Sequence, residues 1–187
     1  MSNRDQLYSS TNFQEFYFRA GDKLPFADGH FDYIFSEHFF EHLFLDEAVA
    51  LFLEARRILR PGGVIRTVVP DADLRTYEPP EPLGFPDRQM PFTDPTKHKT
   101  RWCVYSLCEV LRLVGLLAVP LRYCTKEGEF VCVDPSQQLD CYEACADREI
   151  VADMSHVSRM NSLLVDGIKP PIGSLTSPGG QRHPLHL

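Results

Sequence analysis

The sequence predicts an α/β fold in which an open, mainly parallel sheet carries helices on both faces. Apolar and β-branched runs of strand length alternate along the chain with segments whose apolar residues recur at the helical spacing. The chain has 187 residues, 43% of them apolar, which is enough for one domain with a hydrophobic core. Because such sheets bind ligands beyond the carboxyl ends of their strands, the residues that follow each strand are the first candidates for function.

The predicted strands share a high content of β-branched and aromatic residues. Residues 31–36 (FDYIFS) form a short continuous apolar run, which is typical of a buried parallel strand. Residues 64–69 (VIRTVV) are β-branched, and we expect them to lie parallel to residues 31–36 in the same sheet. The same criteria predict strands over residues 13–19, 116–123 and 162–169.

Helices are predicted between these strands. From Ala48 to Leu59 the apolar residues recur at i, i+3, i+4, i+7, i+10 and i+11, and Pro61-Gly62-Gly63 ends this helix. Ser106-x-x-Glu109 is a capping box that opens another helix, which Gly115 ends. Asp71 can cap a further short helix that extends through Tyr77.

These elements predict a single domain over residues 13–170. Residues 1–12 are polar and residues 171–187 form a tail rich in Pro and Gly, so we expect both segments to be flexible. Six prolines between Glu78 and Pro95 exclude a regular element there. Residues 79–95 are therefore expected to form a long surface loop or lid.

Composition and charge narrow the class of partner. A net charge of -7 and a pI near 5.5 argue against binding to nucleic acid or to a membrane surface. The longest mostly apolar run, residues 113–121, is far shorter than the ~20 residues that span a bilayer, and no signal peptide is recognisable. We expect a cytoplasmic protein with six free thiols, whose partners are small molecules or proteins.

Residues 35–44 (FSEHFFEHLF) concentrate titratable side chains directly after a predicted strand. His38-x-x-Glu41-His42 has the H-x-x-E-H spacing of one class of zinc peptidases, although no downstream glutamate is marked as a third ligand. A zinc hydrolase therefore remains a remote alternative, and no residue is assigned to a metal. A simpler interpretation places Glu41 and His42 in the first turn of the following helix, with His38 as a half-buried polar group that is satisfied locally.

A third interpretation rests on the order of several short patterns. Residues 21–32 read Gly21-Asp22-x-Leu24-Pro25-Phe26-x-Asp28-x-x-Phe31-Asp32, and two further patterns follow, Ser36-Glu37-His38-x-x-Glu41-His42 and Ala55-x-Arg57-x-Leu59-x-Pro61-Gly62-Gly63. Together they resemble the middle of class I S-adenosylmethionine-dependent methyltransferases, specifically the type 11 group. The resemblance spans roughly residues 14–170 and continues through residues 69–71, 98–107 and 162–170.

The resemblance implies a Rossmann-like methyltransferase sheet and a set of cofactor-binding residues. Asp22 would accept a hydrogen bond from the adenine amino group of S-adenosylmethionine, and Leu24 would pack on the adenine ring. Ser36 and Glu37 would lie beneath the methionine end of the cofactor. Residues 31–36 would then be the fourth strand of the sheet.

The resemblance also implies the catalytic residues. His38 and His42 would face a small hydroxyl- or amine-bearing acceptor, where a neutral imidazole can take a proton as the methyl group arrives. Glu37 would act beside them. The sequence does not specify the acceptor.

The glycine-rich turn that the family places after its first strand is absent, because none of the eleven glycines are spaced as G-x-G. The expected fold is therefore an N-terminally truncated methyltransferase sheet. Without a first strand, residues 31–36 become an edge that invites pairing. Three explanations are open: residues 13–19 cover this edge, two copies of the chain join there in a symmetric homodimer, or the chain is a fragment of a longer protein. We expect one of the first two, and a homodimer is the partner that we predict.

Two classes of function follow. The first is a methyltransferase that uses S-adenosylmethionine, and the second is a methyltransferase-like binding or dimerisation module without catalysis. The absent glycine-rich turn favours the second for the isolated chain.

Overall fold

The computed structural model describes residues 19, 21–74, 98–145, 148–159 and 161–171, and it forms one five-stranded sheet with the strand order β1-β2-β5-β3-β4. The strands are β1 (Phe31–Glu37), β2 (Leu59–Val69), β3 (Leu117–Cys124), β4 (Phe130–Cys132) and β5 (Leu163–Ile168). The helices are α2 (Leu45–Ile58), α3 (Val104–Leu113) and α4 (Arg148–Ala152), with 3-10 segments η1 (Phe40–His42) and η2 (Pro135–Tyr142).

The predicted α/β class is confirmed, and so is the parallel pairing of β1 with β2, in which Ile34 lies opposite Ile65. The prediction of a mainly parallel sheet is wrong. The final strand, β5, lies between β2 and β3 and runs antiparallel to both, and β4 joins β3 as an antiparallel hairpin. Strand direction is set by these long-range pairings, which a local hydrophobic pattern does not encode.

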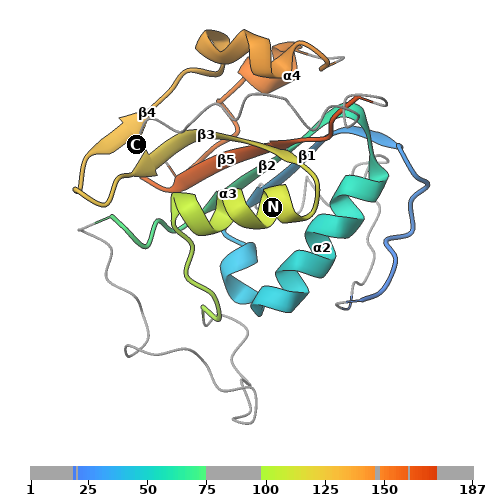
Figure 1. Ribbon diagram of the computed structural model, residues 1–187, viewed down its shortest axis with the longest axis horizontal. Helices are drawn as coiled ribbons and strands as arrows, with labels where there is room; N and C mark the ends of the chain where they lie inside the picture. The colour runs from blue at the N-terminus through green and yellow to red at the C-terminus, as the bar shows by residue number, and fades with distance from the viewer. Residues whose placement is uncertain (1–18, 20, 75–97, 146–147, 160, 172–187) are drawn as a thin grey trace, which may run out of the picture.

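Helices cover both faces of the sheet, as predicted. Figure 1 shows α2 and α3 on one face and the segment from η2 to α4 on the other. Successive residues of β2 face opposite layers. Ile65 belongs to the core cluster that contains residues of α2 and α3, whereas Val64 and Val68 belong to the cluster that contains Tyr142 of η2. This period of two is what a strand buried on both faces requires.

Helix α2 forms where its apolar stripe predicts it. Ala48, Phe52, Ala55 and Ile58 are all buried, and the carboxylate of Glu47 accepts a hydrogen bond of 2.8 Å from the amide of Phe44 at the N-terminus. Within the described part of the chain, no helix is both long and apolar enough to cross a membrane.

Helix α3 begins earlier than the predicted capping box implies. Ser106 is the third residue of the helix rather than its N-cap, and its Oγ accepts a hydrogen bond of 3.0 Å from the amide of Cys103. The hydroxyl therefore caps the helix from inside the first turn. Gly115 ends the helix as predicted, with a φ of 82° that suits glycine.

Of the remaining predicted elements, two strands are confirmed, one helix start is wrong, and the others fall outside the described residues. The strands expected at residues 116–123 and 162–169 are confirmed as β3 and β5. Residues 71–74 form a bridge and a turn rather than the start of a helix, because the Asp71 carboxylate accepts hydrogen bonds from the amides of Asp73 and Cys124. Four predictions fall outside the described residues: the loop at 79–95, the N-terminus at 1–12, and, except for residues 19 and 171, the strand expected at 13–19 and the tail at 171–187.

Candidate functional site

A pocket of about 560 Å³ lies along β1, between the loop that precedes this strand and helix α2. Three of the predicted cofactor residues, Leu24, Ser36 and Glu37, line it. Most of the remaining wall is apolar or aromatic and includes Phe26, Tyr33, Phe39, Phe40 and Leu51. A concave, largely apolar wall with few polar groups and a volume in this range is typical of small-molecule sites.

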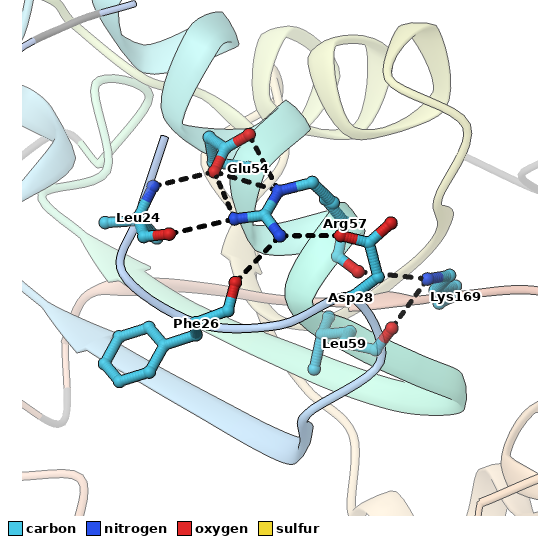
Figure 2. Close-up of polar contacts among 7 residues, drawn as sticks. All are labelled: Leu24, Phe26, Asp28, Glu54, Arg57, Leu59 and Lys169. Carbon is cyan, nitrogen blue, oxygen red and sulfur yellow. Dashed lines mark hydrogen bonds and ion pairs between the residues drawn. The ribbon is translucent and has the colours of Figure 1, made fainter. Parts of the chain in front are cut away.

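The loop at the mouth of this pocket is held by a single arginine on α2. Figure 2 shows the guanidinium of Arg57 donating to the carbonyl oxygens of Leu24 (3.0 Å) and Phe26 (2.9 Å). The same guanidinium binds Asp28 Oδ1 at 2.7 Å and Glu54 Oε2 at 2.7 Å, and Glu54 Oε2 in turn accepts from the amide of Leu24 at 2.8 Å. The forked guanidinium thus fixes the backbone of the loop at several points.

The charges around Arg57 favour this arrangement. Its hydrogen bonds hold the pKa of Glu54 and the pKa of Asp28 below their usual range, so both carboxylates are anionic at neutral pH. The sequence did not predict this role, because Arg57 stood out only as part of a family pattern. The signal that could have found it is an arginine preceded, one helical turn earlier, by a glutamate on the same helix face.

Ser36 presents an unsatisfied hydroxyl at the pocket. Its Oγ is buried and has no hydrogen-bond partner among the described residues. A buried hydroxyl without a partner is costly in a protein interior, and most such groups find one. A polar atom of a ligand in the pocket would supply the missing partner.

Glu37 is committed to a contact within the protein. Its carboxylate accepts hydrogen bonds from the amide of Ser158 (2.8 Å), from Ser158 Oγ (2.6 Å) and from the amide of Arg159 (2.8 Å). Burial raises the pKa of Glu37, but the bonds from Ser158 and Arg159 outweigh burial and leave the pKa below its usual value. The carboxylate therefore fixes the segment before β5 at the carboxyl end of β1.

Asp22 is exposed at the start of the same loop and is not part of the pocket wall. Its amide donates a hydrogen bond of 2.9 Å to the carbonyl of Arg19. The structure therefore brings together three of the four predicted cofactor residues and places Asp22 beside them on the loop that leads to Leu24.

The predicted catalytic histidines lie beyond the end of β1, outside the pocket wall. His38 adopts a φ of 50°, which is uncommon for a residue other than glycine, and its amide donates to the carbonyl of Val68 at 2.8 Å. Its Nε2 lies 2.9 Å from Ser162 Oγ, and burial lowers the pKa of the ring. His42 packs its ring against His98, with centroids 5.0 Å apart.

The backbone around these histidines departs from two interpretations of the sequence. Segment η1 contains only three residues, so His38 and His42 do not lie one turn apart on an α-helix as the zinc-hydrolase alternative required. Helix α2 begins at Leu45, so Glu41 and His42 precede it rather than forming its first turn. His38 has a local and a distant neighbour, because its Nδ1 lies 3.4 Å from Glu41 Oε1 and its Nε2 lies 2.9 Å from Ser162 Oγ.

Comparison with known proteins supports the resemblance seen in the sequence. Residues 3–67 match the family model of a methyltransferase domain. A search of curated proteins found no match. The extent of the family match covers the pocket loop, β1, α2 and most of β2.

The solved structures that this chain matches include several methyltransferases. One is in the complex between the Haloferax volcanii Trm112 methyltransferase activator and a putative methyltransferase, with 20% identity over 88% of this chain and 66% of that chain and a TM-score of 0.47. Another is a SAM-dependent methyltransferase from Archaeoglobus fulgidus, with 16% identity over 77% of this chain and 62% of that chain and a TM-score of 0.43. A third is the 1,6-didemethyltoxoflavin-N1-methyltransferase of Burkholderia thailandensis with bound S-adenosylhomocysteine, with 14% identity over 77% of this chain and 46% of that chain and a TM-score of 0.42. The chain spans less than two thirds of the length of each of these three.

Proposed function

We infer from the family match over residues 3–67 that the chain is a class I methyltransferase-like protein, and we propose that it transfers a methyl group from S-adenosylmethionine to a small acceptor. One observation carries the proposal: the pocket along β1 assembles Leu24, Ser36 and Glu37, which the family pattern assigns to the cofactor. The unsatisfied Ser36 hydroxyl in its wall is what a site for a polar ligand would provide.

The cofactor would lie against the loop that Arg57 holds. Leu24 offers an apolar side chain for the adenine ring, and the exposed carboxylate of Asp22 is available for the adenine amino group. Ser36 would donate to, or accept from, the methionine end. When bound, S-adenosylmethionine supplies the activated methyl group and its leaving group, so the protein's part is to align the acceptor and to exclude water.

His38 is our candidate for the group that takes a proton from the acceptor. Because burial lowers the pKa of its ring, the imidazole is neutral at pH 7 and can accept a proton. His42 would assist on the acceptor side. Glu37 is better suited to positioning than to proton transfer, because its oxygens already accept three hydrogen bonds from Ser158 and Arg159.

Calorimetry with S-adenosylmethionine tests the proposal. Binding at micromolar strength supports the methyltransferase, with S-adenosylhomocysteine as the matched product ligand. No heat at millimolar cofactor would contradict it and would leave the alternative, a methyltransferase-like module that binds partners without catalysis.

We also propose that two copies of the chain associate through β1. In the described part of the sheet β1 is an outer strand that pairs only with β2, and the side chains of Phe35 and Phe39 nearby are 37% and 46% exposed. An apolar edge of this kind favours pairing with a second strand. Light scattering of the purified chain should give the mass of a dimer, and a monomer at all concentrations would contradict this proposal.

Truncation of the sheet and a cytoplasmic location remain proposals as well. The first rests on the lack of G-x-G spacing among the glycines, and the second on the shortness of the longest apolar run, residues 113–121.

A further inference from the structure

The carboxylate of Glu41 is buried and has no hydrogen-bond partner among the described residues. The residue is 1% exposed, and within the described residues neither of its carboxylate oxygens accepts a hydrogen bond. Since a buried carboxylate without a hydrogen bond is rare, a ligand that completes it is the simplest explanation.

Three imidazoles lie beside this carboxylate, and His38 Nδ1 is 3.4 Å from Glu41 Oε1. His42 Nε2 is 3.8 Å from Glu41 Oε1, and the ring of His98 crosses that of His42 at 73°. One donor atom each from Glu41, His42 and His98 lies within 4.8 Å of the others. His42 and His98 are half-buried, which keeps the cluster accessible from solvent.

Main-chain contacts hold the two segments of this cluster together. The amides of Lys99 and Thr100 donate to the carbonyl of Glu41 at 2.7 and 3.1 Å, and Thr100 Oγ1 donates to the carbonyl of Leu43 at 2.5 Å. These bonds do not involve the side chains of the cluster. The backbone therefore presents His98 to Glu41 and His42 independently of any ligand.

We propose that Glu41, His42 and His98 bind a divalent transition-metal cation of the Zn²⁺ type. Two imidazole nitrogens and one carboxylate oxygen form a ligand set that suits Zn²⁺ and does not suit Mg²⁺, which prefers oxygen ligands only. Donor atoms around a tetrahedral Zn²⁺ lie about 3.4 Å apart, so side-chain shifts of about 1 Å would close the set. The cation would neutralise the buried charge of Glu41.

This ligand set differs from the H-x-x-E-H alternative, and it was not predicted from the sequence. The Nε2 of His38 is bonded to Ser162, and His98 takes its place from a segment far along the chain. The metal site shares His42 with the proposed acceptor side, but its test measures binding of the metal alone and does not depend on methyl transfer.

Metal titration of the full-length chain tests the inference. Protein purified without a metal-affinity step and treated with a chelator is titrated with ZnCl₂ by calorimetry and with CoCl₂ by visible absorption. We expect one equivalent of Zn²⁺ to bind at micromolar strength or tighter, Co²⁺ to develop a d–d spectrum, and MgCl₂ to give no heat. Absence of Zn²⁺ binding by the intact chain would overturn the proposal.

Substitutions identify the ligands. His98→Ala and Glu41→Gln should each weaken Zn²⁺ binding about tenfold or more. Glu41→Gln also removes a buried carboxylate that accepts no hydrogen bond, so it should not destabilise the metal-free protein, and this separates loss of a ligand from loss of the fold.

Other histidines provide the controls. His30→Ala, at an exposed position, and the tail variant His183→Ala with His186→Ala should leave the affinity unchanged. Binding that is lost in the tail variant and kept in His98→Ala would place the metal elsewhere and overturn the proposal.

Discussion

The guanidinium of Arg66 on β2 and the carboxylate of Asp166 on β5 form a bidentate ion pair in which both side chains are fully buried. Arg66 also donates to the carbonyl of Val151, and the hydroxyl of Tyr142 donates to Asp166 Oδ2 at 2.8 Å. The pair therefore connects the sheet to the layer formed by η2 and α4. The contribution of this buried network to stability depends on every polar group in it having a hydrogen-bond partner.

Replacing Asp166 by Asn should destabilise the protein strongly. The substitution keeps the volume but leaves the charge of Arg66 buried without a counterion, which costs about 3–5 kcal/mol of unfolding free energy. Urea unfolding measures the change. As a control, Glu109→Gln removes one partner of the exposed pair with Arg112 and should change the unfolding free energy by less than about 1 kcal/mol. Equal effects of the two substitutions would contradict the role assigned to the buried pair.

Arg57→Lys should loosen the loop at the mouth of the pocket. Lysine keeps the charge but lacks the fork that reaches the carbonyls of Leu24 and Phe26, so the loop opens more often. Amide hydrogen exchange of Leu24, whose N–H is bonded to Glu54, should become about 10- to 100-fold faster. Arg112→Lys, on the exposed face of α3, is the matched control and should leave this rate unchanged. Unaltered exchange in Arg57→Lys would show that other contacts hold the loop.

Much of the fold could be predicted from the sequence because its signals are local. The stripe of α2 and the apolar run of β1 each reflect burial of neighbouring positions, which a periodic pattern records. The antiparallel insertion of β5 could not be predicted, since it depends on pairing between distant strands. Arg66 likewise looks like a polar residue within VIRTVV, and its partner is 100 residues away.

The candidate site also combines residues near one another in sequence with contacts between distant segments. Leu24, Ser36 and Glu37 belong to family patterns that flank one strand, and they line one pocket, while their role in cofactor binding stays a prediction. Neither the role of Arg57 nor the position of His98 was predicted. Each depends on a contact between segments far apart in sequence, and local spacing signals only the Glu54–Arg57 pair, not the loop or the ring that these side chains meet.

Glu37→Gln should change how stability depends on pH. The carboxylate has a lowered pKa in the folded state, so its stabilising effect is present above its ordinary pKa and is lost as pH falls through the folded pKa. The difference in urea midpoint between the native sequence and Glu37→Gln should therefore be larger at about pH 6 than at about pH 3. Ser158→Ala, which removes one donor to this carboxylate, should reduce the pH dependence in the same direction. A midpoint difference that is constant with pH would contradict the assignment.

Ser36→Ala should weaken the binding of S-adenosylmethionine without lowering the stability of the protein. Because the Ser36 hydroxyl has no partner within the described structure, its removal should leave the unfolding free energy unchanged or slightly higher. If a polar atom of S-adenosylmethionine is its partner, the affinity should fall about 2- to 10-fold, which calorimetry and urea unfolding together can measure. Ser106→Ala is the converse control, because its hydroxyl caps α3 and its loss should lower stability without changing the affinity. An unchanged affinity in Ser36→Ala would exclude this hydroxyl from the cofactor site, whereas a large loss of stability would show that it has a structural partner.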